Sequence, residues 1–255
     1  DERDASGIDS IFSWSGNTDL VIGIIKLIED AMNAEEDILT GGVQAILLVE
    51  DSVRFYSTYL PALYKLILQQ NTEFLKDAFN EQQQILRNRA RPKILLATNY
   101  ADAVALYERY KKNLLGVISD VGFVLHKGDS PSTEKLDAGI DLCRLVRADN
   151  PLMPVLLQSS QTASAAQARE LGAGFIAKNS KTLLQELSDF IAARFAFGDF
   201  LFKDLSTGRV IGRAKDLHEM QRLHRATPRR YARKRWRRNK SRDRIWPPRP
   251  APAAC

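Results

Sequence analysis

Cysteine and long hydrophobic runs are both scarce in this sequence. Only 2 of its 255 residues are cysteines, Cys143 and Cys255, which excludes a disulfide framework and a cysteine-based metal site. No apolar run approaches the ~20 residues that a membrane-spanning helix needs, and no signal-peptide pattern opens the sequence. We therefore expect no membrane contact and a reducing, cytoplasmic location.

Histidine is scarce, and the positive charge is unevenly distributed along the chain. None of the three histidines, His126, His218 and His224, lies in a kinase-like setting, so we expect no self-phosphorylation on histidine. Residues 222–255 contain eleven Arg, two Lys and one Asp, a net charge of +12, whereas the whole chain carries +6. The first 221 residues therefore have a net charge of −6. The basic character is confined to one tail.

This tail, residues 224–255, is rich in Arg, Pro and Ala and lacks a periodic apolar face, which predicts disorder. One interpretation is a nucleic-acid-binding arm in which Arg contacts phosphates and Trp236 and Trp246 stack on bases. The other is a non-native end, from an out-of-frame or vector-derived sequence. The abrupt change of composition near Arg222 favours the second interpretation, so we do not expect nucleic acid as a partner.

What the sequence does contain is a series of short apolar runs. Five of them are rich in Ile, Leu and Val without period-two alternation: residues 45–49, 93–97, 114–119, 154–158 and 173–177. Continuous apolar runs are typical of parallel strands that are buried on both faces. Helical patterns separate the runs, at 53–90, 101–112, 135–148, 162–171 and 181–195. This alternation predicts a three-layer α/β fold with right-handed crossovers and an extended first helix.

Polar side chains follow four of these predicted strands. Glu50 and Asp51 come after the first, Asp120 after the third, Ser159 after the fourth and Lys178 after the fifth. In open α/β sheets, ligands bind at the carboxyl ends of the strands. Three carboxylates, a hydroxyl and an ammonium at one edge would suit a phosphoryl group, whose transfer needs charge neutralisation and alignment.

The order of these motifs resembles a response-regulator receiver domain of the CheY-like superfamily, over residues 44–195. Val49-Glu50-Asp51 is similar to the family's acidic pair and Ile118-Ser119-Asp120 to its phospho-acceptor. Gln158-Ser159-Ser160 resembles the Ser/Thr switch site, and Phe175-Ile176-Ala177-Lys178 resembles the aromatic-x-x-Lys motif. The resemblance implies a (βα)5 flavodoxin-like fold with a five-stranded parallel sheet of order 2-1-3-4-5.

The resemblance also implies a role for each residue. Asp120 would accept the phosphoryl group, Lys178 and Ser159 would bind its oxygens, and Glu50, Asp51 and Asp120 would hold Mg²⁺. Ser159 and Phe175 would be the switch residues. A histidine kinase or a phosphotransfer protein would supply the phosphoryl group, and an attached or partner output domain would receive the signal. Such a domain would at most phosphorylate itself from a donor and dephosphorylate itself.

Some features depart from the family and keep an alternative open. Asn179 follows Lys178 where the family has proline, the Met-Pro that usually comes after the acceptor is absent, and the interval from Asp51 to Asp120 is long. The alternative is a pseudo-receiver, which is an interaction or dimerisation module that acts without phosphate.

The flanks suggest a larger protein. Residues 1–38 resemble the last strand, at 10–14, and the last helix of a preceding, degenerate receiver, although a helix that packs on the main domain is an alternative. An exposed apolar helix there would favour a homodimer. We expect the receiver itself at 43–196, and at 197–223 a hairpin followed by a helix start at Ala214–Leu223. This arrangement resembles the regulatory region of bacterial proteins that carry a phosphoenolpyruvate-synthase-like module.

Overall fold

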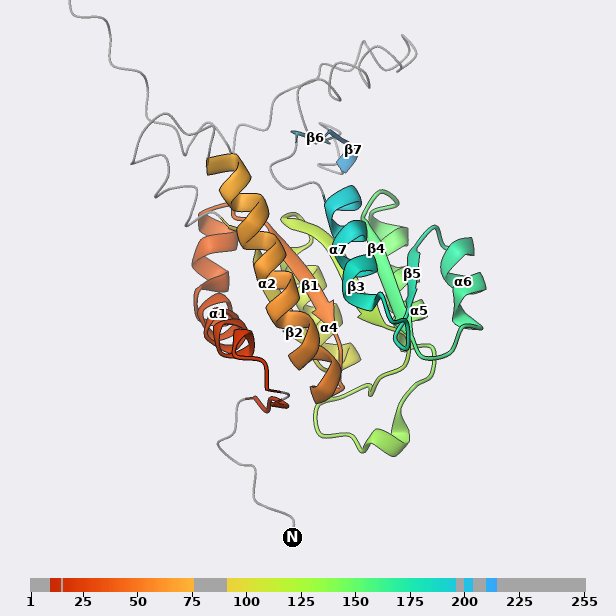
Figure 1. Cartoon of the computed structure of the whole chain (residues 1–255). Helices are drawn as coiled ribbons and strands as arrows, with labels where there is room; N and C mark the ends of the chain where they lie inside the picture. The colour runs from red at the N-terminus through yellow and green to blue at the C-terminus, as the bar shows by residue number, and fades with distance from the viewer. Residues whose placement is uncertain (1–9, 15, 76–90, 196–199, 204–209, 215–255) are drawn as a thin grey trace, which may run out of the picture. The chain divides into compact units, whose positions relative to one another are not determined.

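A five-stranded parallel sheet between two layers of helices forms the body of the molecule (Figure 1). The computed structural model describes residues 10–14, 16–75, 91–195, 200–203 and 210–214. The described residues up to Phe195 form one compact unit, and a small hairpin belongs to a second. No helix in these ranges combines the length and the apolar character that crossing a membrane requires.

The strands follow the order β2-β1-β3-β4-β5, and all neighbours are parallel. Their bounds are β1 (Ala45–Val49), β2 (Lys93–Ala97), β3 (Leu114–Asp120), β4 (Val155–Ser159) and β5 (Gly174–Ala177). This confirms the flavodoxin-like fold and the order 2-1-3-4-5. All five residues of β1 are buried, as are the first six of β3, because both are inner strands covered on both faces.

The helices occupy the positions that the periodicity predicts. They are α2 (Val53–Leu75), α4 (Tyr100–Tyr110), α5 (Ala138–Asp149), α6 (Ser164–Glu170) and α7 (Leu183–Arg194). In Figure 1, α2 and α7 lie in front of the sheet and α4 and α5 behind it. The far half of the predicted 53–90 helix lies outside the described residues from position 76 on. Asn99 begins α4 as an N-cap, since its side chain accepts a hydrogen bond from the Asp102 N–H.

An additional helix precedes the five βα units. Helix α1 (Asp19–Ala34), followed by a π-helical segment η1 (Glu35–Thr40), packs against α2 and against the edge strand β2. The prediction of a strand at 10–14 is wrong, because these residues pair with none of the strands that the structure describes. They are anchored by hydrogen bonds instead: the Ser13 N–H donates to Ser57 Oγ, and the Tyr56 hydroxyl donates to the Ile11 carbonyl. The origin of residues 1–38 in a preceding receiver stays a prediction.

The carboxylate of Asp30 fixes α1 to the sheet edge. It is fully buried and accepts hydrogen bonds from the Tyr64 hydroxyl, the Arg91 guanidinium and the Ile94 main-chain N–H. An edge strand presents unpaired N–H groups, which here are partly satisfied by a side chain rather than by another strand. Helix α1 is therefore an integral part of this unit in the structure.

The second unit contains a hairpin of β6 (Phe200–Lys203) and β7 (Val210–Ala214), which pair antiparallel with Phe200 opposite Ala214. A hairpin is what the sequence predicts here. The helix start was expected from Ala214, but Ala214 still belongs to β7, because its pairing with Phe200 continues the strand. The remainder of the predicted helix, up to Leu223, and the basic tail lie outside the described residues, and the domain bounds stay predictions.

Candidate functional site

Strand register brings the candidate residues to one edge of the sheet. Val49 of β1 pairs with Ser119 of β3, so the residues that follow, Glu50 and Asp120, are neighbours. Asp120 in turn pairs with Gln158 of β4, and Ser159 pairs with Ala177 of β5, directly before Lys178. Because parallel strands all end at the same edge, groups far apart in sequence meet there.

Glu50, Asp51 and Asp120 form an acidic cluster. One carboxylate oxygen from each lies within 4.8 Å of the other two. Burial and then the charge of Asp120 raise the pKa of Glu50 to about 8. Burial and then Asp120 also raise the pKa of Asp51. Carboxylates crowded out of water in this way favour a proton or a cation between them. Three hard oxygen donors fit Mg²⁺, which is bound by a few carboxylates and keeps several waters.

Lys178 is the cation that lies against this cluster. Its Nζ is 2.8 Å from Glu50 Oε1 and 2.7 Å from Glu50 Oε2, and it also donates to Asp120 Oδ2. The side chain of Lys178 is 4% exposed, so these contacts are protected from water and screened little by salt. The ammonium also lies 4.3 Å from the centroid of the Phe55 ring, within the range of a cation–π contact. Lys178 therefore has a fixed position beside the Asp120 carboxylate.

The main chain around Asp120 is equally constrained. Its Oδ1 accepts a hydrogen bond of 2.7 Å from the Val121 N–H. The first turn of α5 closes on the same segment, because the Gly139 N–H donates to the Val121 carbonyl at 2.8 Å. A Cβ on Gly139 would lie 2.0 Å from the Asp120 carbonyl oxygen, so only glycine fits there. The sequence analysis did not single out Gly139, and no local pattern distinguishes it.

Neither of the two candidate switch residues, Ser159 and Phe175, belongs to the acidic cluster. Ser159 is buried at the end of β4, and its Oγ accepts a hydrogen bond of 3.0 Å from the Gln161 N–H. Its carbonyl accepts from the Lys178 N–H at 2.9 Å, which ties the two strand ends together. Phe175 is half-buried and packs against the core on the α4–α5–α6 side of the sheet. Ser159 is thus linked to the acidic cluster through Lys178, whereas Phe175 lies further back on β5, opposite Leu157 of β4.

Two aromatic residues on α2 approach the site and were missed by sequence reasoning. Phe55 and Tyr59 stack with ring centroids 6.0 Å apart, as residues four apart on a helix can. The Tyr59 hydroxyl is buried and has no hydrogen-bond partner within the described ranges. Burial, and after it the charges of Glu50 and Asp120, raise the pKa of Tyr59. The only sequence signal was the spacing of Phe55 and Tyr59 shortly after Asp51, and this spacing is also typical of a helix face that packs in the hydrophobic core.

A fourth carboxylate, from Glu134, lies near the cluster. The segment between β3 and α5 contains a short 3₁₀ helix η2 (Pro131–Thr133) and returns to β3 through a bridge between Phe123 and Lys135. This return brings Glu134 close to Gly122, where a Cβ would lie 2.3 Å from Glu134 Oε1. Burial and then the charges of Asp51 and Asp120 raise the pKa of Glu134. The sequence indicated a long loop here, but not that the path of the loop brings Glu134 close to Gly122.

The solved structures to which the chain is similar include receiver domains. The chain is similar to a response regulator receiver domain protein from Clostridium thermocellum, with 17% identity over 60% of this chain and 94% of that one and a TM-score of 0.39. It is also similar to the receiver domain of the hybrid histidine kinase CckA, with 17% identity, 59% and 98% coverage and a TM-score of 0.30.

A third similar structure is the response regulator DrrB, a Thermotoga maritima OmpR/PhoB homolog, with 18% identity over 64% of this chain and 58% of that one and a TM-score of 0.33. No family model and no curated protein sequence matches the chain. The flavodoxin-like fold therefore rests on the strand order and the parallel pairing within the chain itself.

Proposed function

We propose that this chain is a two-component receiver that accepts a phosphoryl group on Asp120. The observation that supports this most strongly is the contact of Lys178 with Asp120 at the edge where Glu50 and Asp51 also lie. An acidic nucleophile, an oxygen-rich cation site and an ammonium are the three components that phosphoryl transfer to a carboxylate needs. The fold delivers all three from different strands.

Each residue has a defined task in the proposed reaction. An Asp120 carboxylate oxygen attacks phosphorus and forms the new O–P bond, while the P–N bond of a donor phosphohistidine breaks and the imidazole nitrogen leaves with the electron pair. Lys178 remains in place to bind a phosphoryl oxygen as a point charge. Glu50, Asp51 and Asp120 would hold Mg²⁺, which would neutralise charge between the anionic nucleophile and the anionic donor.

The proposed switch uses Ser159 and Phe175. The phosphoryl group brings about −1.5 to −2 charges at neutral pH, and the Ser159 hydroxyl would leave Gln161 to donate to a phosphoryl oxygen. Phe175, two residues before the end of β5, would follow and repack the surface formed by α6, β5 and α7. A complete shift between two states would require about 5.5 kcal/mol of differential stabilisation. A histidine kinase or phosphotransfer protein is the proposed donor, and an output domain the proposed recipient of the signal.

A mass measurement tests the reaction directly. The chain is incubated with Mg²⁺ and acetyl phosphate, and the intact mass is recorded over time. We expect an adduct of one phosphoryl group that is absent in Asp120→Asn and absent when EDTA replaces Mg²⁺. Asp129→Asn, in the exposed part of the loop after β3, is the matched control and should keep the adduct. Absence of an adduct with both acetyl phosphate and a panel of phosphorylated phosphotransfer proteins would exclude this function.

A pseudo-receiver is the second candidate, and the position of Glu134 favours it. A carboxylate above Gly122, two residues after Asp120, adds negative charge where a phosphoryl group would enter. If this charge blocks the site, Glu134→Gln should gain an adduct that the wild-type chain lacks. If the wild-type chain is phosphorylated at the same rate as Glu134→Gln, the blocking role is contradicted.

A further inference from the structure

Helix α1 is apolar on two opposite sides. Its inner stripe, Leu20, Gly23, Leu27, Asp30 and Ala34, is buried against the domain. Its outer side carries large aliphatic side chains that are 48% exposed at Val21, 57% at Ile25, 50% at Ile28 and 80% at Met32. A helix that is apolar all round is normally buried all round. The outer side of α1 therefore has the composition of an interface and not of a solvated surface.

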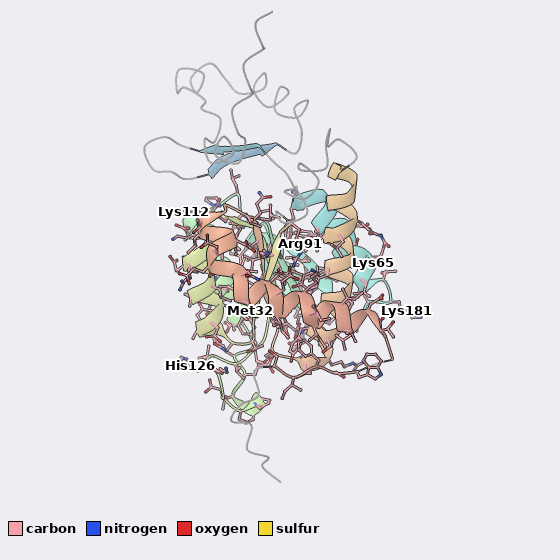
Figure 2. All side chains as sticks on the ribbon, turned by 90° about the vertical axis from the view of Figure 1, so that its left-hand side faces the viewer. Met32, Lys65, Arg91, Lys112, His126 and Lys181 are labelled. Atoms are coloured by element: carbon pink, nitrogen blue, oxygen red, sulfur yellow. The ribbon has the colours of Figure 1, made fainter. Side chains whose placement is uncertain are left out.

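The outer residues follow a particular spacing. Val21, Ile25, Ile28 and Met32, here called the α1 seam, are separated by steps of four, three and four residues. This is the spacing of the a and d positions of a heptad, by which one helix packs against another helix. Figure 2 looks onto α1, which crosses the front of the domain with Met32 labelled along it. The seam thus specifies a helical partner.

The size of the patch supports a stable contact. With Ile22 and Leu39, which are 51% and 49% exposed, the seam offers on the order of 600 Å² of apolar surface, the upper end of what one patch on a monomer shows. A standard interface buries about 800 Å² per partner, so the seam and its flanks together approach that area. Three charged residues lie between Asp19 and Glu35. Lys26 and Glu29 pair with each other at 2.6 Å, and Asp30 faces inward, so the seam itself contains no charged side chain.

We propose that the occupant of the α1 seam is the α1 seam of a second copy of this chain. A two-fold dimer uses the same patch on both copies, so a self-complementary apolar heptad series suits it. Within the described ranges, no other exposed large apolar side chains form a heptad series. The exposed large apolar residues that follow η1 are scattered along the chain: Leu68, Leu136, Leu152 and Leu184. The seam itself is therefore the matching helical surface that this chain offers.

The charges at the two ends of α1 set the direction of pairing. Glu35, Glu36 and Asp37 follow its last turn in η1, which continues the helix to Thr40 without a basic residue in its last turn, so three acids lie toward the carboxyl end, whereas the first turn of α1 contains one acid, Asp19. An antiparallel arrangement brings the positive N-terminal end of the partner helix beside these acids. A parallel arrangement would place Glu35 and Glu36 next to the same acids of the partner. The dimer that the geometry favours is antiparallel, centred between Ile25 and Ile28.

Oligomeric state tests the proposal on the whole chain. Light scattering after size exclusion should give the mass of two copies at about 100 µM, because an interface of this size typically gives micromolar or tighter affinity. Ile25→Lys should raise the dissociation constant at least about tenfold, since it buries an unpaired charge. Met32→Lys, at the most exposed seam position, gives a second variant that cannot disturb the core. Leu152→Lys, 47% exposed and outside α1, is the matched control and should leave the dimer unchanged.

Cross-linking tests the direction of the helices, in a chain whose native Cys143 and Cys255 are replaced by serine. In the antiparallel dimer, Ile28→Cys lies about 5 Å along the axis from its counterpart, whereas Met32→Cys lies about 16 Å from its own, at 1.5 Å per residue. A short bis-maleimide should therefore cross-link Ile28→Cys and not Met32→Cys. A monomeric wild-type chain, or a dimer that Ile25→Lys and Met32→Lys leave intact, would overturn the proposal, and efficient cross-linking of Met32→Cys would overturn its direction.

Discussion

The carboxylate of Asp30 in α1 accepts a hydrogen bond of 2.9 Å from the main-chain N–H of Ile94 in the edge strand β2. The same carboxylate lies 2.7 Å from an Arg91 guanidinium nitrogen and 3.6 Å from the Lys93 ammonium, which flank the start of that strand. One buried carboxylate thus accepts a hydrogen bond from a main-chain N–H of the edge strand and neutralises two cations. These contacts fix α1 to the sheet.

Replacing Asp30 should destabilise the domain strongly. Asp30→Ala leaves Arg91 nearly buried without its main partner, and removing one member of a buried ion pair costs about 3–5 kcal/mol. Asp30→Asn keeps an acceptor for the Ile94 N–H and should cost less than the alanine variant. Urea denaturation followed by circular dichroism gives both values. Glu29→Gln is the control, since Glu29 is 41% exposed and its contact with Arg91 is 3.4 Å long, and it should change stability by less than about 1 kcal/mol.

Removing the Lys178 ammonium should affect both stability and the proposed chemistry. Lys178→Met leaves Glu50 and Asp120 buried against each other with no cation, so we expect a marked loss of stability at pH 8 that is smaller at pH 5, where the carboxyls take up protons. The variant should also lose the phosphoryl adduct. Thermal denaturation at the two pH values tests the first expectation. The exposed Lys181→Met should change neither property, and an equal loss at both pH values in Lys178→Met would contradict the electrostatic explanation.

The raised pKa of Glu50 predicts a pH dependence of folding. Burial and the Asp120 charge move the pKa of this carboxyl from 4.5 to about 8, so the folded chain holds the proton more tightly than the unfolded chain. Between these two values the folded state binds more protons, and stability must fall as pH rises. We expect the midpoint of thermal unfolding in EDTA to decrease from pH 5 to pH 8.

Mg²⁺ should reverse this trend, because a cation bound by the ionised carboxylates stabilises the folded state most where they have lost their protons. Millimolar Mg²⁺ should therefore raise the melting midpoint more at pH 8 than at pH 5. Glu50→Gln should weaken both the pH dependence and the Mg²⁺ effect, and Asp51 and Asp120, whose pKa values are also raised, account for the remainder. A midpoint that stays constant from pH 5 to pH 8 in EDTA would show that Lys178 keeps Glu50 ionised throughout.

Two glycines should respond oppositely to alanine. A Cβ on Gly116 of β3 would lie 2.3 Å from the fully buried Phe195 ring, so Gly116→Ala must displace that ring and should cost about 1–3 kcal/mol. A Cβ on Gly23 of α1 would meet Pro61 and Leu60 of α2 at 3.4–3.6 Å, which is ordinary contact. Gly23→Ala should therefore stabilise the chain by about 0.5–1 kcal/mol through helix propensity. Chemical denaturation of both variants measures these changes in stability. A destabilising Gly23→Ala would mean that α1 and α2 cannot move apart enough to accommodate the added methyl group.

Much of the fold could be predicted from the sequence, because its signals are local. Five continuous apolar runs mark strands buried on both faces, and the helical periodicities between them match α2, α4, α5, α6 and α7. The candidate site was predictable for a related reason. Parallel strands end at one edge, so Glu50, Asp51, Asp120 and Lys178 had to lie near one another once the strands were assigned. The strand predicted at 10–14 failed, because a short apolar segment fits several structures and the edge beside β2 is occupied by α1.

The sequence by itself therefore determined the five strands, the parallel order suggested by the receiver motifs, and the acids and lysine at the strand ends. Only the tertiary structure decided that Lys178 contacts both Glu50 and Asp120, that Glu134 returns to Gly122, that Gly139 must lack a side chain, and that α1 closes the sheet edge through Asp30. Periodicity indicates which side of a helix or strand is buried, but not which distant polar group that side contacts. Such contacts depend on strand register, loop path and packing, which exist only in the folded chain.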